Sequence, residues 1–273
     1  REINTLGIIS LTSGNRSTLV ESPTQGDAFS FHEVRCSEKV FAWVEMNYAA
    51  NDWVLVAQQL VNGQLTGDPT KLDEGDGDWE PARFTASGES VIWQKMPTTT
   101  GSKTSRKSHC YRWRVGDSKG SDLWESTGRF ATYPHVSEGI LTIAPRVKNG
   151  DGVYYGITAI DLDDGGKMVD QLVMPQTVTP FEAVYMGQSF AFSVEANYSS
   201  GGSLGKMGTF IGREGGPFVF LSREPLACVA GKGSRYLIKV QSSHFVVDTD
   251  AQTFGVLTAP DKTLEYGDYP ASA

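Results

Sequence analysis

Short apolar segments recur along the chain at a spacing close to 50 residues. Phe41–Met46 aligns with Val91–Met96, two further steps of 50 reach Leu141–Arg146 and Ala191–Ala196, and a shorter step reaches Tyr236–Val240. These segments are rich in Val, Ile, Phe, Trp and Tyr, which favour β-strands. A period of this length indicates an array of similar supersecondary units.

Each repeat contains three further strand-like segments. In the first repeat Phe31–Val34 precedes the central segment and Trp53–Val61 follows it, and the second repeat has Ala82–Phe84 and Cys110–Val115 in the same places. A weaker fourth segment closes each unit, and Gly, Asn, Asp, Ser and Pro separate the segments, as is typical of turns. Apolar positions do not keep a helical spacing over any long stretch, so we expect minimal helix content.

Four short strands in each of five repeats predict an all-β fold, a β-propeller with five four-stranded blades. Radial stacking covers both faces of each blade, which explains why its second strand is apolar at almost every position. We expect a single domain spanning 1–273. The predicted blades lie at about 29–80, 81–134, 135–182, 183–226 and 227–273.

Residues 1–28 carry two more strand-like segments, Asn4–Leu11 and Ser17–Glu21. We expect these strands to form the outer half of a blade whose inner half lies at the C-terminus, so that they close the ring. A six-bladed arrangement is the alternative, in which the N-terminal strands and Thr263–Tyr269 form an incomplete extra blade.

The segment Phe84–Trp93 resembles a corner of the TolB-like β-propellers of bacterial envelope proteins. Its Ser87-Gly88-Glu89 stands where that family has Ser-Pro-Asp-Gly before an apolar strand, although no copy in this chain keeps the Pro-Asp. The resemblance covers roughly 29–258 and implies the propeller architecture and an extracytoplasmic, protein-binding function. It supplies no catalytic residues.

Charge and composition exclude several classes of function. The chain has 24 Lys and Arg against 32 Asp and Glu, a net charge of −8, which argues against nucleic-acid binding. No apolar run is long enough for a membrane-spanning helix. The sequence begins at Arg1 without an initiator Met, so we expect a signal or anchor segment upstream and a secreted or membrane- or cell-wall-anchored protein.

The cysteines and histidines do not form a recognisable metal or redox motif. Cys36, Cys110 and Cys228 lack the C-x-x-C spacing, and the four His are scattered. We expect isolated thiols, with one disulfide and one remaining thiol as the alternative.

Loops on one face of a propeller are the expected place for a ligand, because the scaffold beneath them is rigid. By the strand pattern this face collects Asn47–Asp52, Asp73–Glu80, Pro97–His109, Val147–Gly152 and Asn197–Gly205. The candidate ligand-binding residues on and beside these loops are Asn47, Tyr48, Trp79, Glu80, Asn197, Tyr198 and Glu224.

The segment Asp73–Glu80 places five carboxylates within eight residues. Calcium takes six to eight oxygen ligands, so Asp73, Asp76 and Asp78 are candidate Ca²⁺ ligands. Pro81 stands where a calcium-binding loop needs Gly, and a solvated acidic turn is the alternative. We expect no other cofactor.

Two features near this segment have a binding interpretation. Trp79 is the tryptophan we expect to be exposed and available to a ligand, whereas Trp43 and Trp93 occupy equivalent core positions. The polar segment Pro97–His109 is either a mobile, solvated loop or a docking arm for an acidic partner.

These features predict a non-catalytic, extracytoplasmic module that binds a protein or glycan at one propeller face, as part of a larger anchored protein. Contact with a membrane would come only through a segment outside this sequence. The alternative is a five-bladed glycoside hydrolase with a carboxylate pair in its central pocket. Serine-hydrolase and phosphate-binding motifs are absent. The possible acids are Glu33, Glu45, Glu80, Glu182 and Glu195.

Overall fold

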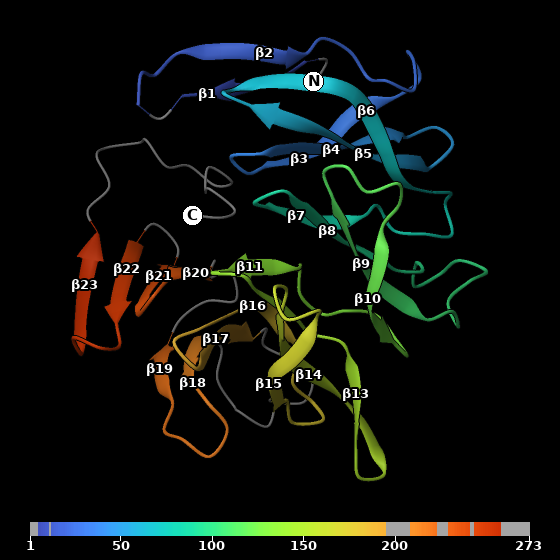
Figure 1. Cartoon of the computed structure of the whole chain (residues 1–273). Coiled ribbons are helices and arrows are strands. Elements are labelled where there is room, and N and C mark those ends of the chain that lie inside the picture. Colours follow the sequence, from blue (N-terminus) through green and yellow to red (C-terminus); the bar gives the residue numbers. More distant parts are fainter. Residues whose placement is uncertain (1–4, 11, 195–207, 223–228, 241–242, 258–273) are drawn as a thin grey trace. The chain divides into compact units, whose positions relative to one another are not determined.

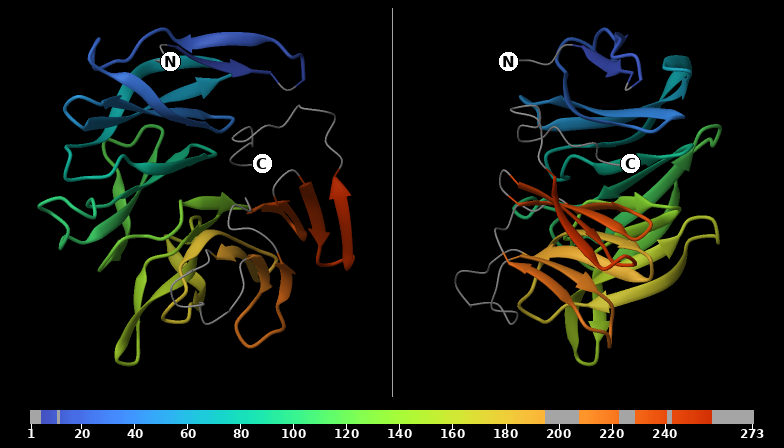
Figure 2. Two further views of the ribbon diagram at one scale, coloured as in Figure 1. Left: turned by 180° about the vertical axis from the view of Figure 1, so that it is seen from behind. Right: turned by 90° about the vertical axis from the view of Figure 1, so that its left-hand side faces the viewer.

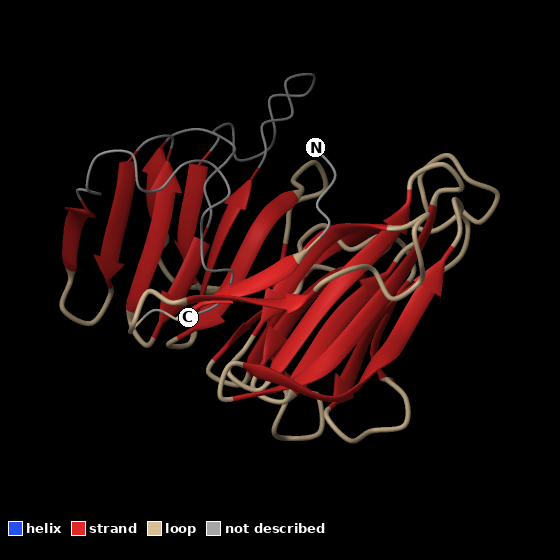
Figure 3. Cartoon of the chain, turned by 90° about the horizontal axis from the view of Figure 1, so that it is seen from above, coloured by secondary structure: helices blue, strands red, loops and turns tan. Residues whose placement is uncertain are grey.

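The computed structural model describes residues 5–10, 12–194, 208–222, 229–240 and 243–257. In these ranges the chain is built from β-strands and turns, and no helix is present (Figure 3). None of the described segments is a helix long and apolar enough to cross a membrane. The chain divides into two compact units, Arg1–Gly128 and Arg129–Ala273.

Unit 1 contains a hairpin and two four-stranded antiparallel sheets, of strand order β3-β4-β5-β6 and β10-β9-β8-β7 (Figure 1). The hairpin strands β1 and β2 form a sheet of their own. The strands are β1 (Leu6–Ile9), β2 (Arg16–Val20), β3 (Ser30–Cys36), β4 (Val40–Asn47), β5 (Asp52–Val61), β6 (Gln64–Gly75), β7 (Arg83–Ser87), β8 (Ser90–Lys95), β9 (Ser108–Arg114) and β10 (Ser121–Ser126).

Unit 2 contains three antiparallel sheets, with β11 to β15 in the first, β16-β17-β18-β19 in the second and β20-β21-β22-β23 in the third. The strands are β11 (His135–Ser137), β12 (Ile140–Ile143), β13 (Arg146–Asn149), β14 (Gly152–Asp161), β15 (Lys167–Val173), β16 (Pro180–Met186), β17 (Ser189–Val194), β18 (Gly208–Gly212), β19 (Val219–Ser222), β20 (Val229–Lys232), β21 (Arg235–Val240), β22 (Ser243–Asp248) and β23 (Thr253–Leu257).

The second strand of a sheet is buried on both faces, as the apolar pattern predicts. In β4, Val44 belongs to the core shared with Trp93 of the second sheet. Its neighbours Phe41 and Trp43 face the other way and pack with Leu6 of the hairpin. Figure 2 shows the hairpin as the outermost layer of unit 1. Trp43 and Trp93 are core residues, which confirms the prediction made for them.

Unit 2 follows the same packing rule. Phe190 and Phe192 of β17 pack toward the core shared with β14, whereas Ala191, between them, packs with Tyr236 of β21. The Tyr236 hydroxyl donates a hydrogen bond of 3.0 Å to the Met186 carbonyl oxygen. Alternate residues of β17 therefore join the sheets on either side of it.

The 50-residue period appears as a recurring hydrogen bond. In four sheets, a backbone N–H near the C-terminal end of β5, β9, β14 or β22 donates a hydrogen bond to a carbonyl oxygen in the turn between the first two strands of the same sheet. These bonds, of 2.9 to 3.0 Å, are Leu60 to Lys39, Val115 to Glu89, Leu162 to Gly139 and Thr249 to Ser234. The sequence repeat is therefore also a repeat of backbone geometry.

Two predicted segments differ in detail. The segment Leu141–Arg146 is divided into β12 and β13, because Pro145 has no backbone N–H to donate to a ladder. Both strands pair with β14. The fourth segment of the second repeat, for which the sequence predicts a strand from Leu123-Trp124 to Phe130, forms β10 and ends at Ser126.

The N-terminal strands pair with each other, and in the described ranges they have no other strand partner. The last sheet takes all four of its strands from the C-terminal part of the chain. The predicted blade shared between the two ends is therefore not found in this part of the structure. Thr263–Tyr269, which the six-bladed alternative invokes, lies outside the described residues.

Candidate functional site

Three of the five segments predicted to share one face form loops of unit 1, and these loops meet at one end of its sheets. Of the other two, Val147–Gly152 spans the turn between β13 and β14 in unit 2, and Asn197–Gly205 lies outside the described residues. The three loops of unit 1 are residues 48–51 between β4 and β5, 76–82 between β6 and β7, and 96–107 between β8 and β9. The Asp78 carboxylate accepts hydrogen bonds from the Ser102 N–H (2.7 Å) and hydroxyl (2.6 Å), and the Asp78 carbonyl accepts one from the Thr98 N–H (2.9 Å). We call these three loops the rim.

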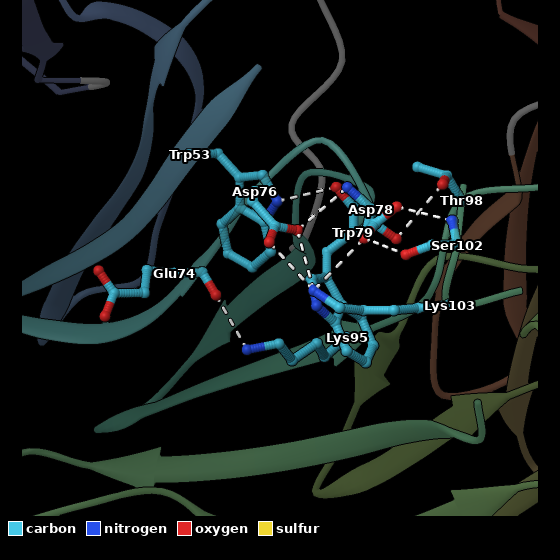
Figure 4. A network of polar contacts seen from close by, with 9 residues as sticks. All are labelled: Trp53, Glu74, Asp76, Asp78, Trp79, Lys95, Thr98, Ser102 and Lys103. Carbon is cyan, nitrogen blue, oxygen red and sulfur yellow. Dashed lines mark hydrogen bonds and ion pairs between the residues drawn. The ribbon is translucent and has the colours of Figure 1, made fainter. Parts of the chain in front are cut away.

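A lysine lies between the two aspartates of the rim (Figure 4). The Lys103 ammonium is 3.0 Å from the Asp76 carboxylate and 3.6 Å from that of Asp78. The hydrogen bond from Lys103 is the main cause of a lowered pKa at Asp76, and the Asp78 N–H adds to it. At Asp78 the Ser102 hydroxyl and N–H are the main causes of the lowered pKa.

The two aspartates should therefore respond differently to two substitutions. Lys103→Met should raise the pKa of Asp76 more than that of Asp78, because Asp76 loses its principal donor. Ser102→Ala removes only the hydroxyl and should raise the pKa of Asp78 more. Carboxyl carbon chemical shifts followed by NMR from pH 6 to 2 would measure both. Equal shifts at the two sites in either variant would contradict this geometry.

Trp79 is half-buried, so the prediction that it is exposed is wrong. Its ring lies against the unit 1 core, with the Lys95 and Lys103 ammonium groups 5.4 and 5.6 Å from the ring centroid. Its carbonyl oxygen accepts a 3.1 Å hydrogen bond from Nε1 of the buried Trp53. Trp79 therefore anchors the rim to the core and is flanked by two cations.

Asp73 lies in β6 and contacts a different lysine from Asp76 and Asp78. Its carboxylate accepts hydrogen bonds from Nε1 of Trp93 (2.9 Å) and from the Lys95 ammonium (2.5 Å). Each of the three predicted calcium ligands thus has an ammonium neighbour. No group of three or more His, Cys, Asp or Glu side chains in the described part of the chain is arranged to hold a metal ion.

Asn47 and Tyr48 have different roles at the first rim loop. The Asn47 side-chain oxygen accepts hydrogen bonds from the Ala49 and Ala50 N–H groups (3.1 and 3.2 Å) and so closes the turn. Tyr48 is 57% exposed, and its hydroxyl lies 3.0 Å from Nδ1 of His32. Tyr48 is therefore the accessible aromatic side chain among the predicted binding residues that the structure describes.

Sequence analysis did not identify His32 as part of this site. The register of β3 against β4 shifts between Phe31 and Glu33, so that His32 is the extra residue of a β-bulge. A bulge redirects the side chain of the extra residue. The strand-like pattern around His32 gave no sign of the bulge, because its position depends on pairing with β4.

Two of the predicted acidic residues, Glu80 in the second rim loop and Glu33 in β3, pair with arginines. Glu80 lies 3.5 Å from Arg83, and Glu33 forms a close ion pair with Arg35. Burial raises the pKa of Glu33, and the Arg35 charge opposes this shift. Glu182 lies in β16, opposite Ser193 of β17. Four other predicted residues lie outside the described residues: Asn197, Tyr198, Glu224 and Glu195.

Glu45 is a buried carboxylate with three N–H donors. Its Oε1 accepts hydrogen bonds from Nε1 of Trp43 and from the Thr24 N–H, both 2.7 Å, and its Oε2 accepts one from the Gln25 N–H at 2.9 Å. Glu45 therefore fixes the connection between β2 and β3 to the first sheet.

No family model and no curated protein matches this chain. Several solved structures match it at low sequence identity. An acylaminoacyl peptidase of Pyrococcus horikoshii matches with a TM-score of 0.52 and 12% identity over 81% of this chain and 38% of its own. A prolyl endopeptidase matches with a TM-score of 0.55 and 13% identity over 86% of this chain and 37% of its own. A third match is the β-propeller domain of the trilobed protease of Pyrococcus furiosus, which is described as having an open velcro topology. It has a TM-score of 0.52 and 11% identity over 84% of this chain and 70% of its own.

The likeness shows the fold. These solved structures contain β-propellers, and the chain spans under two-fifths of the two longer peptidases. The all-β prediction is confirmed, and the fold is of the propeller type.

Proposed function

We propose that this chain is a non-catalytic β-propeller module that binds a protein or glycan ligand at the rim of unit 1. The observation that carries the proposal is the bonding between loops at the rim: Asp78 ties two loops together and Trp53 anchors Trp79. A surface fixed in this way loses little conformational entropy on binding. Tyr48, in the first of the three rim loops, offers an accessible aromatic contact.

The bonding of the acidic residues supports binding over catalysis. A glycosidase needs one carboxyl group as acid and a second as nucleophile or base. Glu45 accepts hydrogen bonds from three N–H donors, and Glu33 and Glu80 are paired with arginines. The propeller parts of the peptidases that this chain resembles are also non-catalytic domains.

The finer architecture is part of the proposal. We propose that the five sheets are five blades of one TolB-like propeller and that the module works outside the cytoplasm, in a larger anchored protein. The corner Ser87-Gly88-Glu89 supports the family assignment, because it forms the β7–β8 turn and Gly88 has a φ of 53°, a conformation that favours Gly.

A printed glycan array, with immobilised acidic and basic peptides on the same slide, tests the proposal. We expect binding to at least one class of probe, lowered at least about tenfold by Tyr48→Ala. Tyr133→Ala is the matched control, because Tyr133 is also exposed but belongs to unit 2. Binding that is unchanged in Tyr48→Ala, or absent from every probe, would count against the rim.

Hydrolysis of aryl glycosides would favour the enzyme instead. The specific observation in its favour is the raised pKa of Glu33, which suits a general acid. We expect no turnover above background. Turnover that Glu33→Gln abolishes, while the folded state is retained, would establish the glycosidase alternative.

Calcium should not bind to the rim with useful affinity. The Lys103 ammonium already lies beside both Asp76 and Asp78, where a cation would bind them, and Asp73 contacts Lys95. We expect titration of 1 mM CaCl₂ in a calorimeter to give only the heat of dilution. Heat that disappears in Asp76→Asn would restore the calcium site.

A further inference from the structure

The free edges of the sheets differ in how well they are protected from pairing with another strand. An edge strand has unpaired N–H and C=O groups, and proteins usually blunt such edges with charge, proline or bulges. β6 contains Pro69, Asp68 and Lys71 and two register shifts against β5. Strands β10 and β15 likewise carry charged residues and a register shift each.

β23 has none of these protections. Its sequence, Thr-Phe-Gly-Val-Leu, holds no charge and no proline, and it pairs with β22 over its whole length without a register shift. Phe254 and Val256 are 55% and 61% exposed. Among the other outer strands in the described part of the chain, β1 and β19 also hold no charge, but each is one residue shorter, and β1 has a register shift against β2.

The side chains of β23 are arranged symmetrically about Gly255. Phe254 lies opposite Val247, and Val256 lies opposite Phe245, so both project from the face of the sheet that holds the buried Val247. The Phe254 ring stacks on Phe245 with centroids 5.1 Å apart. A favourable antiparallel partner centred on Gly255 is one with a β-branched residue opposite Phe254 and an aromatic residue opposite Val256, because aromatic–β-branched pairs stabilise neighbouring strands.

A second copy of the same strand meets this requirement. Two β23 strands related by a two-fold axis at Gly255 place Phe254 of each copy opposite Val256 of the other, a favourable aromatic–β-branched pair. They bring no like charges together, whereas β6, β10 and β15 would each place charged residues beside those of their own copies. We propose that the chain self-associates through antiparallel pairing of its β23 edges.

An interface this small makes a weak dimer. Sedimentation equilibrium should find monomer at about 1 μM and a substantial dimer fraction at about 100 μM. Val256→Lys places a charge on the face of β23 that carries Phe254. It should lower the association constant at least about tenfold. Met168→Lys is the matched control, since Met168 is also exposed, on the outer strand β15, and should leave association unchanged.

Hydrogen exchange of the wild-type protein gives a second measurement that needs no variant. Amides of 253–257 should become more protected between 1 and 100 μM, while those of β15 stay constant. A chain that is monomeric at both concentrations would overturn the proposal. So would association that survives Val256→Lys without protection of β23. Neither result bears on ligand binding at the rim of unit 1.

Discussion

Replacing Glu45 by Gln should lower the free energy of unfolding of unit 1 by about 3 kcal/mol. The carboxylate is fully buried and accepts three hydrogen bonds from N–H groups. A glutamine presents one oxygen and one NH₂ group, so at least one of these donors loses its acceptor and faces another donor. Each buried donor without a partner costs about 1–3 kcal/mol.

Tryptophan fluorescence during urea unfolding measures the change in the free energy of unfolding of unit 1. All six tryptophans precede residue 125, and unit 1 ends at Gly128, so the signal reports unit 1 alone. Glu89→Gln is the matched control, because the Glu89 side chain is exposed and forms a surface ion pair with Lys39, and this variant should cost under about 0.5 kcal/mol. If Glu45→Gln costs less than about 1 kcal/mol, the three bonds do not anchor the β2–β3 connection as described.

The strands could be predicted from sequence because their signal is local. The period that relates Trp43 to Trp93 reflects equivalent buried positions, and the burial of both residues follows from it. The convergence of the rim loops also followed, since antiparallel strands of known order return their loops to fixed ends of a sheet. Both inferences used only the order of apolar and turn residues.

The details of the site could not be predicted because they depend on contacts between residues far apart in sequence. Acidic residues flank Trp79 in the sequence and suggest exposure. In the structure, Lys95 of β8 and Lys103 of the loop after it lie against its ring. Asp73 looked like a member of the acidic loop, yet its pairing with Leu55 in the sheet directs it to Lys95. A run of carboxylates in sequence does not specify which cation each one meets.

The hairpin shows the same limit at a larger scale. The segments Asn4–Leu11 and Ser17–Glu21 were predicted to be strand-like; β1 lies within the first and β2 overlaps the second from Ser17 to Val20. The sequence did not identify the strand with which each of them pairs, because a pattern of apolar residues does not specify which sheet a strand joins. In the described residues the two strands pair with each other and cover Trp43.

Gly75→Ala should destabilise unit 1 by about 2–3 kcal/mol, the upper part of the range of about 1–3 kcal/mol that is typical of overpacking in a well-filled core. Gly75 lies directly opposite Trp53, and a Cβ added there would be 2.5 Å from Cε2 and Nε1 of the indole ring. The ring is buried and cannot move away freely, because Nε1 donates to the Trp79 carbonyl oxygen. Steric strain at Gly75 should therefore be transmitted to Trp79.

Gly77→Ala provides the comparison two residues further on. A Cβ at Gly77 would lie 3.4 Å from Cβ of Asn51, an ordinary contact, so this variant should cost less than about 0.5 kcal/mol. Both variants reduce the freedom of the unfolded chain in the same way, so their difference isolates the contact with Trp53. In an NMR spectrum Gly75→Ala alone should shift the Trp53 indole N–H resonance. Equal stability of the two variants would mean that the Trp53 ring is free to move, and the rim would then lack its anchor to the core.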